Sequence, residues 1–209
     1  MNIQVLDRQN QILFFWFGKL SEETQWDADK SKLWFSSSEE LDREIQETFG
    51  EDIERAASGD YQGWENTPRG RLALILLLDQ FPRNVFRGTP QAYQFDARAQ
   101  KLSLEGIAHG QDQELYPIER QFFYLPLMHA ESLEHQLLSL FVFQKLTQEV
   151  DPSIREHFSL TEGYAKHHFE TVRTYGRFPH RNAILERVNT QEEAAYLAAS
   201  SETYGQTKK

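Results

Sequence analysis

Apolar residues along the chain recur every three or four positions, the spacing of amphipathic helices, and capping residues mark the ends of these stretches. The clearest stripe follows Ser37 and Glu40, whose spacing matches a capping box. Its apolar members stand four residues apart and are Leu41, Ile45, Phe49, Ile53 and Ala57. Gly50 within the stripe could bend this helix, and Gly59 is a natural stop.

A continuous apolar run from Leu72 to Leu78 fits either a buried strand or a buried helix by its pattern alone. Thr67-Pro68 ahead of it supplies a cap and a first-turn proline, and leucine and alanine dominate the run, so we expect a central helix. No period-two alternation is long enough to predict a strand. The predicted helices cover residues 3–17, 23–35, 38–57, 68–81, 90–108, 117–124, 132–148, 152–175 and 191–204.

These elements predict an all-α protein of about eight or nine helices packed as antiparallel hairpins. Connections are mostly short, and no linker rich in glycine, serine or proline divides the chain. We therefore expect a single domain over residues 1–209, with a frayed end from about Tyr204. The side chains expected in its core are Leu74, Leu77, Leu78, Phe122, Phe141 and Phe158.

Composition narrows the classes of protein that remain. The 39% hydrophobic and 13% aromatic content is globular and excludes wholesale disorder. The absence of cysteine removes disulfides, thiol nucleophiles and thiolate metal sites. The apolar stretch 12–17 is too short to span a bilayer and no cleavage site follows it, so we expect a cytoplasmic protein. A net charge of −10 disfavours partners such as nucleic acid or an anionic membrane surface.

Two basic segments interrupt this acidic chain. Residues 66–101 hold six Lys/Arg against two Asp/Glu, and residues 165–187 hold five against two. One interpretation is that both are solvated helix faces. The other is that folding brings the two segments together to hold an anion.

Each basic segment contains a Phe-Pro pair with arginine and asparagine close behind it. We expect a helix to end at each pair, because proline disfavours the α conformation in the residue before it. The polar side chains would then lie near helix C-termini, where they either cap free carbonyl groups or bind a ligand. They are Asp79, Arg83, Asn84 and Arg87 in the first segment, and Arg177, His180, Arg181 and Asn182 in the second.

A third stretch places His129 and Glu131 after the proline break at Pro126. His135 follows, but only Glu131 and His135 would share a helical face, so the spacing does not predict a metal site. Farther along, the helical stripe of residues 154–172 places His168 on the core-facing side. A histidine there is either a hydrogen-bonded structural group or part of a functional cluster.

The stretches 15–18, 78–87, 125–131 and 176–182, with His168, resemble the bacterial domain of unknown function family numbered 924. The resemblance extends over nearly the whole chain. It implies an all-helical fold allied to the tetratricopeptide-like helical repeats, and it implies no established reaction. One departure is Glu186, where the family pattern has a small residue.

Mapped onto this sequence, the resemblance selects one set of candidate ligand-binding residues: Asp79, Arg83, Asn84, Arg87, His129, Glu131, His168, Arg177, His180, Arg181 and Asn182. The leading hypothesis for function is a helical scaffold with a groove for a protein or peptide partner. The alternative is a small-molecule site that holds a phosphate or carboxylate through arginine and histidine, as in a hydrolase or transferase. A purely structural network is the third reading. No cofactor is expected, and the sequence leaves open whether the protein is an enzyme.

A spatial prediction separates these readings. If the two Phe-Pro loops and the turn from His129 to Glu131 line one cavity with His168 at its floor, Arg83 and Arg181 need a counter-charge between them. Asp79 and Glu131 are the carboxylates expected to supply it. If each loop instead caps its own helix, the two arginines will lie on separate surfaces.

Overall fold

The computed structural model describes residues 7–21, 30, 34 and 38–199. All regular secondary structure within these residues is helical, which confirms the all-α prediction. The α-helices are α1 (Arg8–Phe17), α3 (Glu39–Ser58), α4 (Pro68–Ile75), α5 (Phe81–Val85), α6 (Asp96–Ala108), α7 (Pro117–Met128), α8 (Leu133–Glu149), α9 (Arg155–Tyr175) and α10 (Gln191–Ala199). Short 3₁₀ turns are η1 (Gln62–Asn66), η3 (Pro90–Tyr93), η4 (Gln111–Glu114) and η5 (Pro179–Arg181), and η2 (Leu76–Gln80) is a π-helical turn.

The capping residues read from the sequence begin and end most of these helices. Thr67 accepts a hydrogen bond from the Gly70 backbone at the start of α4, and Ser132 caps α8. The α3 cap is Ser38, one residue after the predicted Ser37, and α3 runs unbroken through Gly50. The predicted helix 23–35 falls on residues of which the structure describes only Lys30 and Trp34, and the expected frayed end lies outside the described residues.

The first Phe-Pro pair does not end its helix, contrary to prediction. Gln80 and Phe81 keep α conformations and α5 continues through Pro82 to Val85. The π turn η2 precedes the proline, and such a wider turn accommodates a ring and a missing N–H that a regular α-helix would not. Pro126 likewise lies inside α7, which extends to Met128, four residues beyond its predicted end. The second pair agrees better with the prediction, because α9 ends at Tyr175, before Phe178, and Gly176 caps it with a positive φ of 72°.

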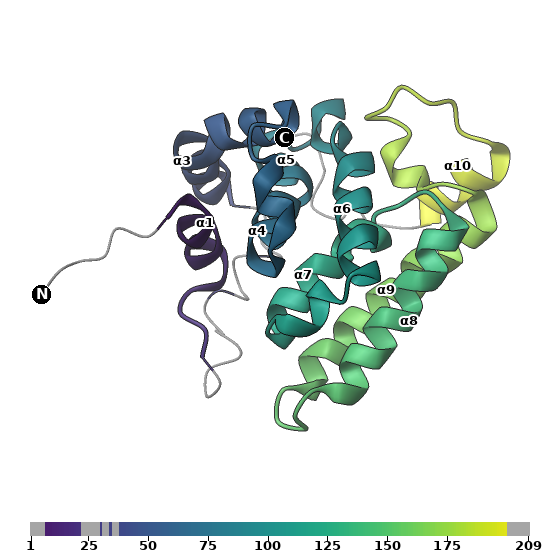
Figure 1. Cartoon of the computed structure of the whole chain (residues 1–209). Coiled ribbons are helices and arrows are strands. Elements are labelled where there is room, and N and C mark those ends of the chain that lie inside the picture. The colour runs from purple at the N-terminus through teal and green to yellow at the C-terminus, as the bar shows by residue number, and fades with distance from the viewer. Residues whose placement is uncertain (1–6, 22–29, 31–33, 35–37, 200–209) are drawn as a thin grey trace, which may run out of the picture.

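From α6 to α9 each helix packs against the next one in the chain, whereas α3 packs against α5, and α4 against α1, α6 and α7. α1 and α3 lie at one end, α4 to α7 form the middle, and α8 and α9 make a long antiparallel hairpin at the other end (Figure 1). α4 contacts α1, α6 and α7, so it occupies the centre as the sequence predicts. No helix among the described residues is both long and apolar enough to cross a membrane. The finer prediction of a tetratricopeptide-like arrangement stays a prediction.

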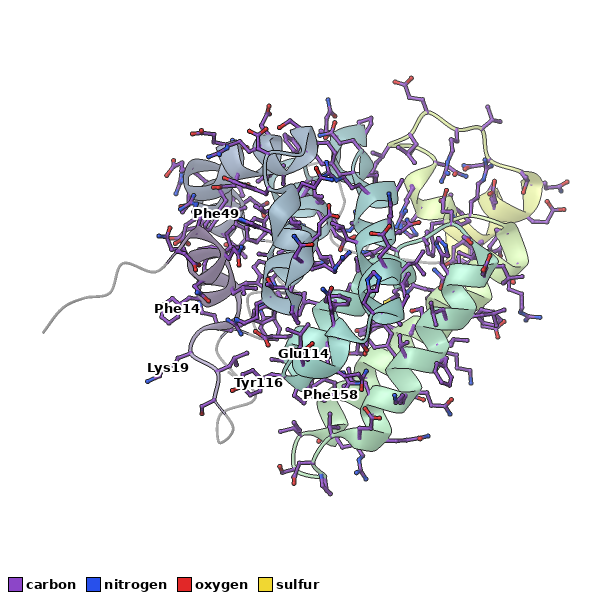
Figure 2. All side chains as sticks on the ribbon, in the orientation of Figure 1. Phe14, Lys19, Phe49, Glu114, Tyr116 and Phe158 are labelled. Carbon is purple, nitrogen blue, oxygen red and sulfur yellow. The ribbon has the colours of Figure 1, made fainter. Side chains whose placement is uncertain are left out.

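One apolar core runs through these layers. Every side chain from Leu72 to Leu78 is fully buried, and the aromatic residues Trp16, Phe17 and Phe122 pack edge to face beside them. The side chains fill the space between the helices, with Phe49 on α3 and Phe158 on α9 at its two ends (Figure 2). Burial is confirmed for five of the six residues predicted in the core: Leu74, Leu77, Leu78, Phe122 and Phe158.

The prediction for Phe141 is wrong, because its side chain is 62% exposed. α8 turns Val142, Phe143 and Leu146 toward the core instead. The helix is apolar on both sides in this stretch, so its hydrophobic pattern alone does not identify the face that packs.

Replacing Leu77 with alanine tests the central position of this segment. Because Leu77 is fully buried in the core cluster, we expect the substitution to lower the free energy of unfolding by about 2–5 kcal/mol. Urea denaturation followed by circular dichroism measures the change. Leu160→Ala, at an exposed position on α9, is the matched control and should change the stability little. Equal effects of the two substitutions would contradict the packing described here.

Candidate functional site

The polar cluster is built around Arg83 on α5, whose side chain lies against three elements. Its guanidinium nitrogens lie 3.2 Å from Asp79 Oδ1 and 3.0 Å from Asp96 Oδ1, and one donates to the Ala92 carbonyl at 3.0 Å. Asp79 stands one turn earlier, in η2, and is fully buried. Asp96 begins α6. Arg83 therefore joins the end of the central helix to the start of α6, and Asp79 supplies the internal counter-charge that the sequence led us to expect.

His129, the residue that ends α7, completes this side of the cluster. Its Nδ1 atom lies 2.9 Å and 3.0 Å from the two carboxylate oxygens of Asp79. Burial disfavours the charged form of Asp79, but the charge of Arg83 and the hydrogen bonds of His129 and Gln80 outweigh it and lower the pKa of the carboxyl. Burial, together with the nearby charge of Arg83, lowers the pKa of His129. Asp79 is thus ionised and His129 neutral near neutral pH.

Arg181, in η5, contacts the second oxygen of the Asp96 carboxylate, whose first oxygen contacts Arg83. Its nearest terminal nitrogen is 3.5 Å from Asp96 Oδ2. The guanidinium lies between two rings, with its centre 4.5 Å from the Phe178 centroid and 4.7 Å from that of Tyr93. Asp96 therefore stands between Arg83 and Arg181, where a carboxylate is needed to offset their repulsion.

Arg181 is poorly compensated in this position. Its side chain is almost inaccessible, with the residue 6% exposed, and its Nε has no hydrogen-bond partner among the described residues. Burial and the charge of Arg83 lower the pKa of Arg181, and the attraction of Asp96, Tyr93 and Glu131 offsets this only in part. The hydroxyl of Tyr93 is also buried without a hydrogen-bond partner in the described part of the chain.

Glu131 forms the outer side of the cluster with Arg187. The two side chains make a two-pronged ion pair, with contacts of 2.6 Å and 2.9 Å. Glu131 also accepts a hydrogen bond from the backbone of Phe178 at 2.8 Å, which anchors the loop after α9 to the end of α7. Burial opposes ionisation, but the hydrogen bonds from Arg187 and Phe178 lower the pKa of Glu131.

His168 and His180 both pack against the Phe178 ring. The ring centroids are 5.3 Å and 5.4 Å from that of Phe178, and His168 Nδ1 donates to the Tyr164 carbonyl at 2.8 Å. Burial, reinforced by neighbouring positive charge, lowers the pKa of His168 to about 3 and that of His180 to about 2. Both are neutral at pH 7, so the charges of the cluster are three guanidinium groups against three carboxylates.

Four of the candidate residues do not join this cluster. Asn84 and Arg87 both bind Asp42 on α3, at 2.9 Å and 2.8 Å, and so fasten α5 to α3. Arg177 and Asn182 bind Glu193 of α10. These four side chains tie helices together. This is the role that the hypothesis of a purely structural network assigned to all the candidate residues.

The carboxylate of Glu193 also accepts a hydrogen bond from the Thr190 backbone, in the predicted cap of α10. The structure thus brings together Asp79, Arg83, His129, Glu131, His168, His180 and Arg181 and separates the other four candidates from them.

Three members of the cluster were absent from the sequence prediction: Tyr93, Asp96 and Arg187. The sequence predicts a single helix over residues 90–108 and does not single out Asp96. This stretch is in fact a 3₁₀ turn followed by a new helix, and the break at Phe95 puts Asp96 in the first turn of α6. The sequence does contain a signal that points to Asp96 as a partner for the arginines, because Asp79 and Asp96 are the only acidic residues in the basic segment 66–101.

No metal site is formed by the described residues, in which no three His, Asp or Glu side chains converge as ligands. The cluster offers instead guanidinium groups, a tyrosine hydroxyl and neutral imidazoles. Guanidinium groups bind carboxylate and phosphate oxygens through paired N–H donors. The chemistry available here is therefore recognition of an anion or internal ion pairing.

Comparison with known proteins shows which proteins the whole chain is similar to. The sequence model described as "Bacterial protein of unknown function (DUF924)" matches residues 12–201. The solved structure of a protein of unknown function from Agrobacterium tumefaciens is 34% identical, with a TM-score of 0.77 over 92% of this chain and 97% of that one. No curated protein matches the chain.

Glu186, next to Arg187, generates a prediction about backbone strain. It has a φ of 54°, a left-handed conformation that glycine adopts far more readily than residues with a side chain. This explains why a small residue suits the position. We expect Glu186→Gly to raise the free energy of unfolding by about 0.5–1 kcal/mol. Glu186→Ala is the control and should give no such gain, because alanine keeps the Cβ atom; equal gains would assign the effect to the lost charge.

The two central arginines should respond differently to replacement by methionine. Arg83→Met leaves Asp79 and Asp96 without their main partner, so we expect a loss of about 3–5 kcal/mol in the free energy of unfolding. Arg181→Met removes a poorly compensated charge and keeps an apolar stem between the rings of Tyr93 and Phe178, so the change should stay within about 1 kcal/mol. Urea unfolding of both variants measures the difference. An equally large loss of stability for Arg181→Met would show that Arg181 stabilises the fold as much as Arg83 does.

Proposed function

This chain belongs to the DUF924 family of bacterial proteins of unknown function, and we propose that it binds a small molecule through a carboxylate or phosphate group at Arg181, beside Arg83. The observation that carries the proposal is the incomplete pairing of Arg181. A buried guanidinium with an unused donor is costly unless something else completes its hydrogen bonds. An anionic ligand would do so.

Three other arginines near the cluster have shorter carboxylate contacts, although the Nε atom of Arg187, like that of Arg181, has no hydrogen-bond partner among the described residues. Arg87, Arg177 and Arg187 each make at least one carboxylate contact of 2.8 Å or less, the usual length of a charge-assisted hydrogen bond. Arg181 is more deeply buried than these three, yet its carboxylate contact is 3.5 Å long. Of these four arginines, the most buried therefore has the longest carboxylate contact.

The surroundings of Arg181 suit a planar or tetrahedral anion. Nε and a terminal nitrogen form the edge of the guanidinium that binds two oxygens at once. The Tyr93 hydroxyl is a further donor without a partner among the described residues, and Arg83 adds positive charge on the far side of Asp96. Asp96 itself occupies the space between the arginines and would compete with a bound anion.

Binding is better supported than proton transfer. A general acid or base works best when its pKa lies near the working pH. Burial lowers the pKa of His168 to about 3 and that of His180 to about 2, which leaves both imidazoles neutral and weakly basic. These histidines can accept hydrogen bonds from a ligand, and they are poorly suited to the hydrolase or transferase chemistry considered as an alternative.

A helical scaffold that binds a protein is the second candidate. Exposed apolar side chains on α8 and α9 favour it, among them Leu137, Phe141 and Leu160. Such binding does not depend on Arg181. Substitutions at Arg181 therefore separate the two functions.

Calorimetric titration with inorganic phosphate and with succinate, on the full chain, tests the proposal. We expect one of these probes to bind, and to raise the melting temperature in proportion to its occupancy of the folded state. Arg181→Met should abolish the binding while leaving the fold intact. Asp96→Asn should strengthen it by about tenfold, because the internal competitor for both guanidinium groups loses its charge.

Arg120→Met is the matched control for these titrations. Arg120 is also buried, but it pairs with Tyr124 and Glu149 away from the cluster, so its loss should lower stability without affecting the anion. The proposal would be overturned if neither phosphate nor succinate binds, or if binding survives Arg181→Met. Lower stability of Arg181→Met without any ligand effect would favour the structural network instead.

A further inference from the structure

α8 carries three exposed apolar side chains in one row. Leu133, Leu137 and Phe141 are 47%, 53% and 62% exposed, and their spacing of four residues places them along a single ridge of the helix. The opposite side of α8 packs Val142, Phe143 and Leu146 into the core. The row of Leu133, Leu137 and Phe141, the α8 ridge, is thus a second apolar face with no covering element among the described residues.

Two opposite charges border the α8 ridge on the same side. At 100° per residue, Glu134 and Lys145 lie within about 20° of each other around the helix axis, just beyond Phe141. One stands near each end of the ridge, 11 positions apart, and both are exposed. Such an arrangement is complementary to itself when a second helix runs in the opposite direction.

We propose that α8 pairs with α8 of a second copy of this chain, antiparallel, about a two-fold axis between Leu137 and Phe141. A two-fold axis perpendicular to two facing antiparallel helices keeps the same flank on the same side, so Glu134 of each copy meets Lys145 of the other. Leu137 packs against Phe141 of the second copy. Leu133 covers the aliphatic stem of Lys145 from the second copy.

The charges within each chain permit this exchange. Lys145 already lies 3.6 Å from Glu149 on the surface of α8, with both side chains well exposed. An exposed ion pair of this kind contributes little, so its replacement by a contact with Glu134 of the second copy costs little. The two α8 dipoles also oppose one another in the antiparallel pair.

The size of the α8 ridge sets the strength of the dimer. Three side chains on each copy bury less surface than the roughly 800 Å² per partner of a stable complex. The pair is therefore a weak, concentration-dependent dimer, with a dissociation constant on the order of 100 µM. The proposal is independent of anion binding at Arg181, which lies in a different part of the chain.

Sedimentation velocity of the full chain, from low micromolar to near-millimolar concentration, tests this pairing. The expected result is a shift from monomer to dimer that Leu137→Glu abolishes, because it buries two like charges at the centre of the interface. Leu160→Glu is the matched control, because Leu160 is a leucine on α9 that is at least as exposed as Leu137, and it should leave the dimer unchanged. Circular dichroism of each variant confirms that the helices are intact.

Charge reversal gives the more specific readout. Glu134→Lys should weaken association by about tenfold, and the double variant Glu134→Lys with Lys145→Glu should restore it, because the complementary pairs reform with opposite polarity. A protein that stays monomeric at all concentrations overturns the proposal. So does a dimer that survives Leu137→Glu, or one that Leu160→Glu dissociates instead.

Discussion

Ion pairing between arginine and a largely buried carboxylate is the interaction on which this helical assembly depends. A carboxylate taken out of water needs a compensating charge, and in this protein most of the arginines that supply it belong to a different element. Arg8 pairs with Asp52, Arg87 with Asp42 and Arg177 with Glu193, so α1, α5 and the loop after α9 are each tied to a distant element. Arg83 with Asp96 makes the central tie. Hydrophobic packing brings the helices together, and these pairs decide which register and which ends meet.

The central cluster differs from the peripheral ties in how completely it is satisfied. Glu131 and Arg187 form a two-pronged pair through both terminal nitrogens of Arg187, whereas Asp96 is shared between Arg83 and Arg181. One carboxylate cannot hold two guanidinium groups equally well, and Arg181 has the longer contact. Positions that are less stable than their surroundings are where binding sites are expected, because a ligand can supply the missing interaction. That inequality is why the anion site is assigned to Arg181 and not to the cluster as a whole.

The backbone around the central helix departs from regular α-helical geometry at two prolines. Pro82 and Pro126 lie inside helices, where a proline removes a backbone hydrogen bond. Before Pro82 the chain forms a π turn, and the turn carries Asp79 to the side of α5 on which Arg83 lies one turn later. An uninterrupted α-helix would place the proline ring against the preceding turn. The irregularity therefore belongs to the construction of the site, as π turns often do.

The sequence by itself determined the helical class, most helix boundaries and most of the core. Thr67-Pro68, Ser132 and Gly59 act on neighbouring backbone groups, so their effects are local and readable. The all-apolar run 72–78 could only be buried, whatever the topology. Charge counting also identified the two basic segments, and the need for a carboxylate between them.

Only the tertiary structure decided which groups meet. Asp79 pairs with Arg83 as expected, but the carboxylate that contacts both Arg83 and Arg181 is Asp96, which the break between η3 and α6 at Phe95 places in the first turn of α6. Asn84 and Arg87 found Asp42, and Arg177 and Asn182 found Glu193, although they share local sequence with Arg83 and Arg181. Phe141 faces outward for the same reason, since α8 is apolar on two sides and packing selects one. Partner choice depends on distances between elements far apart in the chain, and these distances are set by the packing of the whole molecule and not by any local pattern.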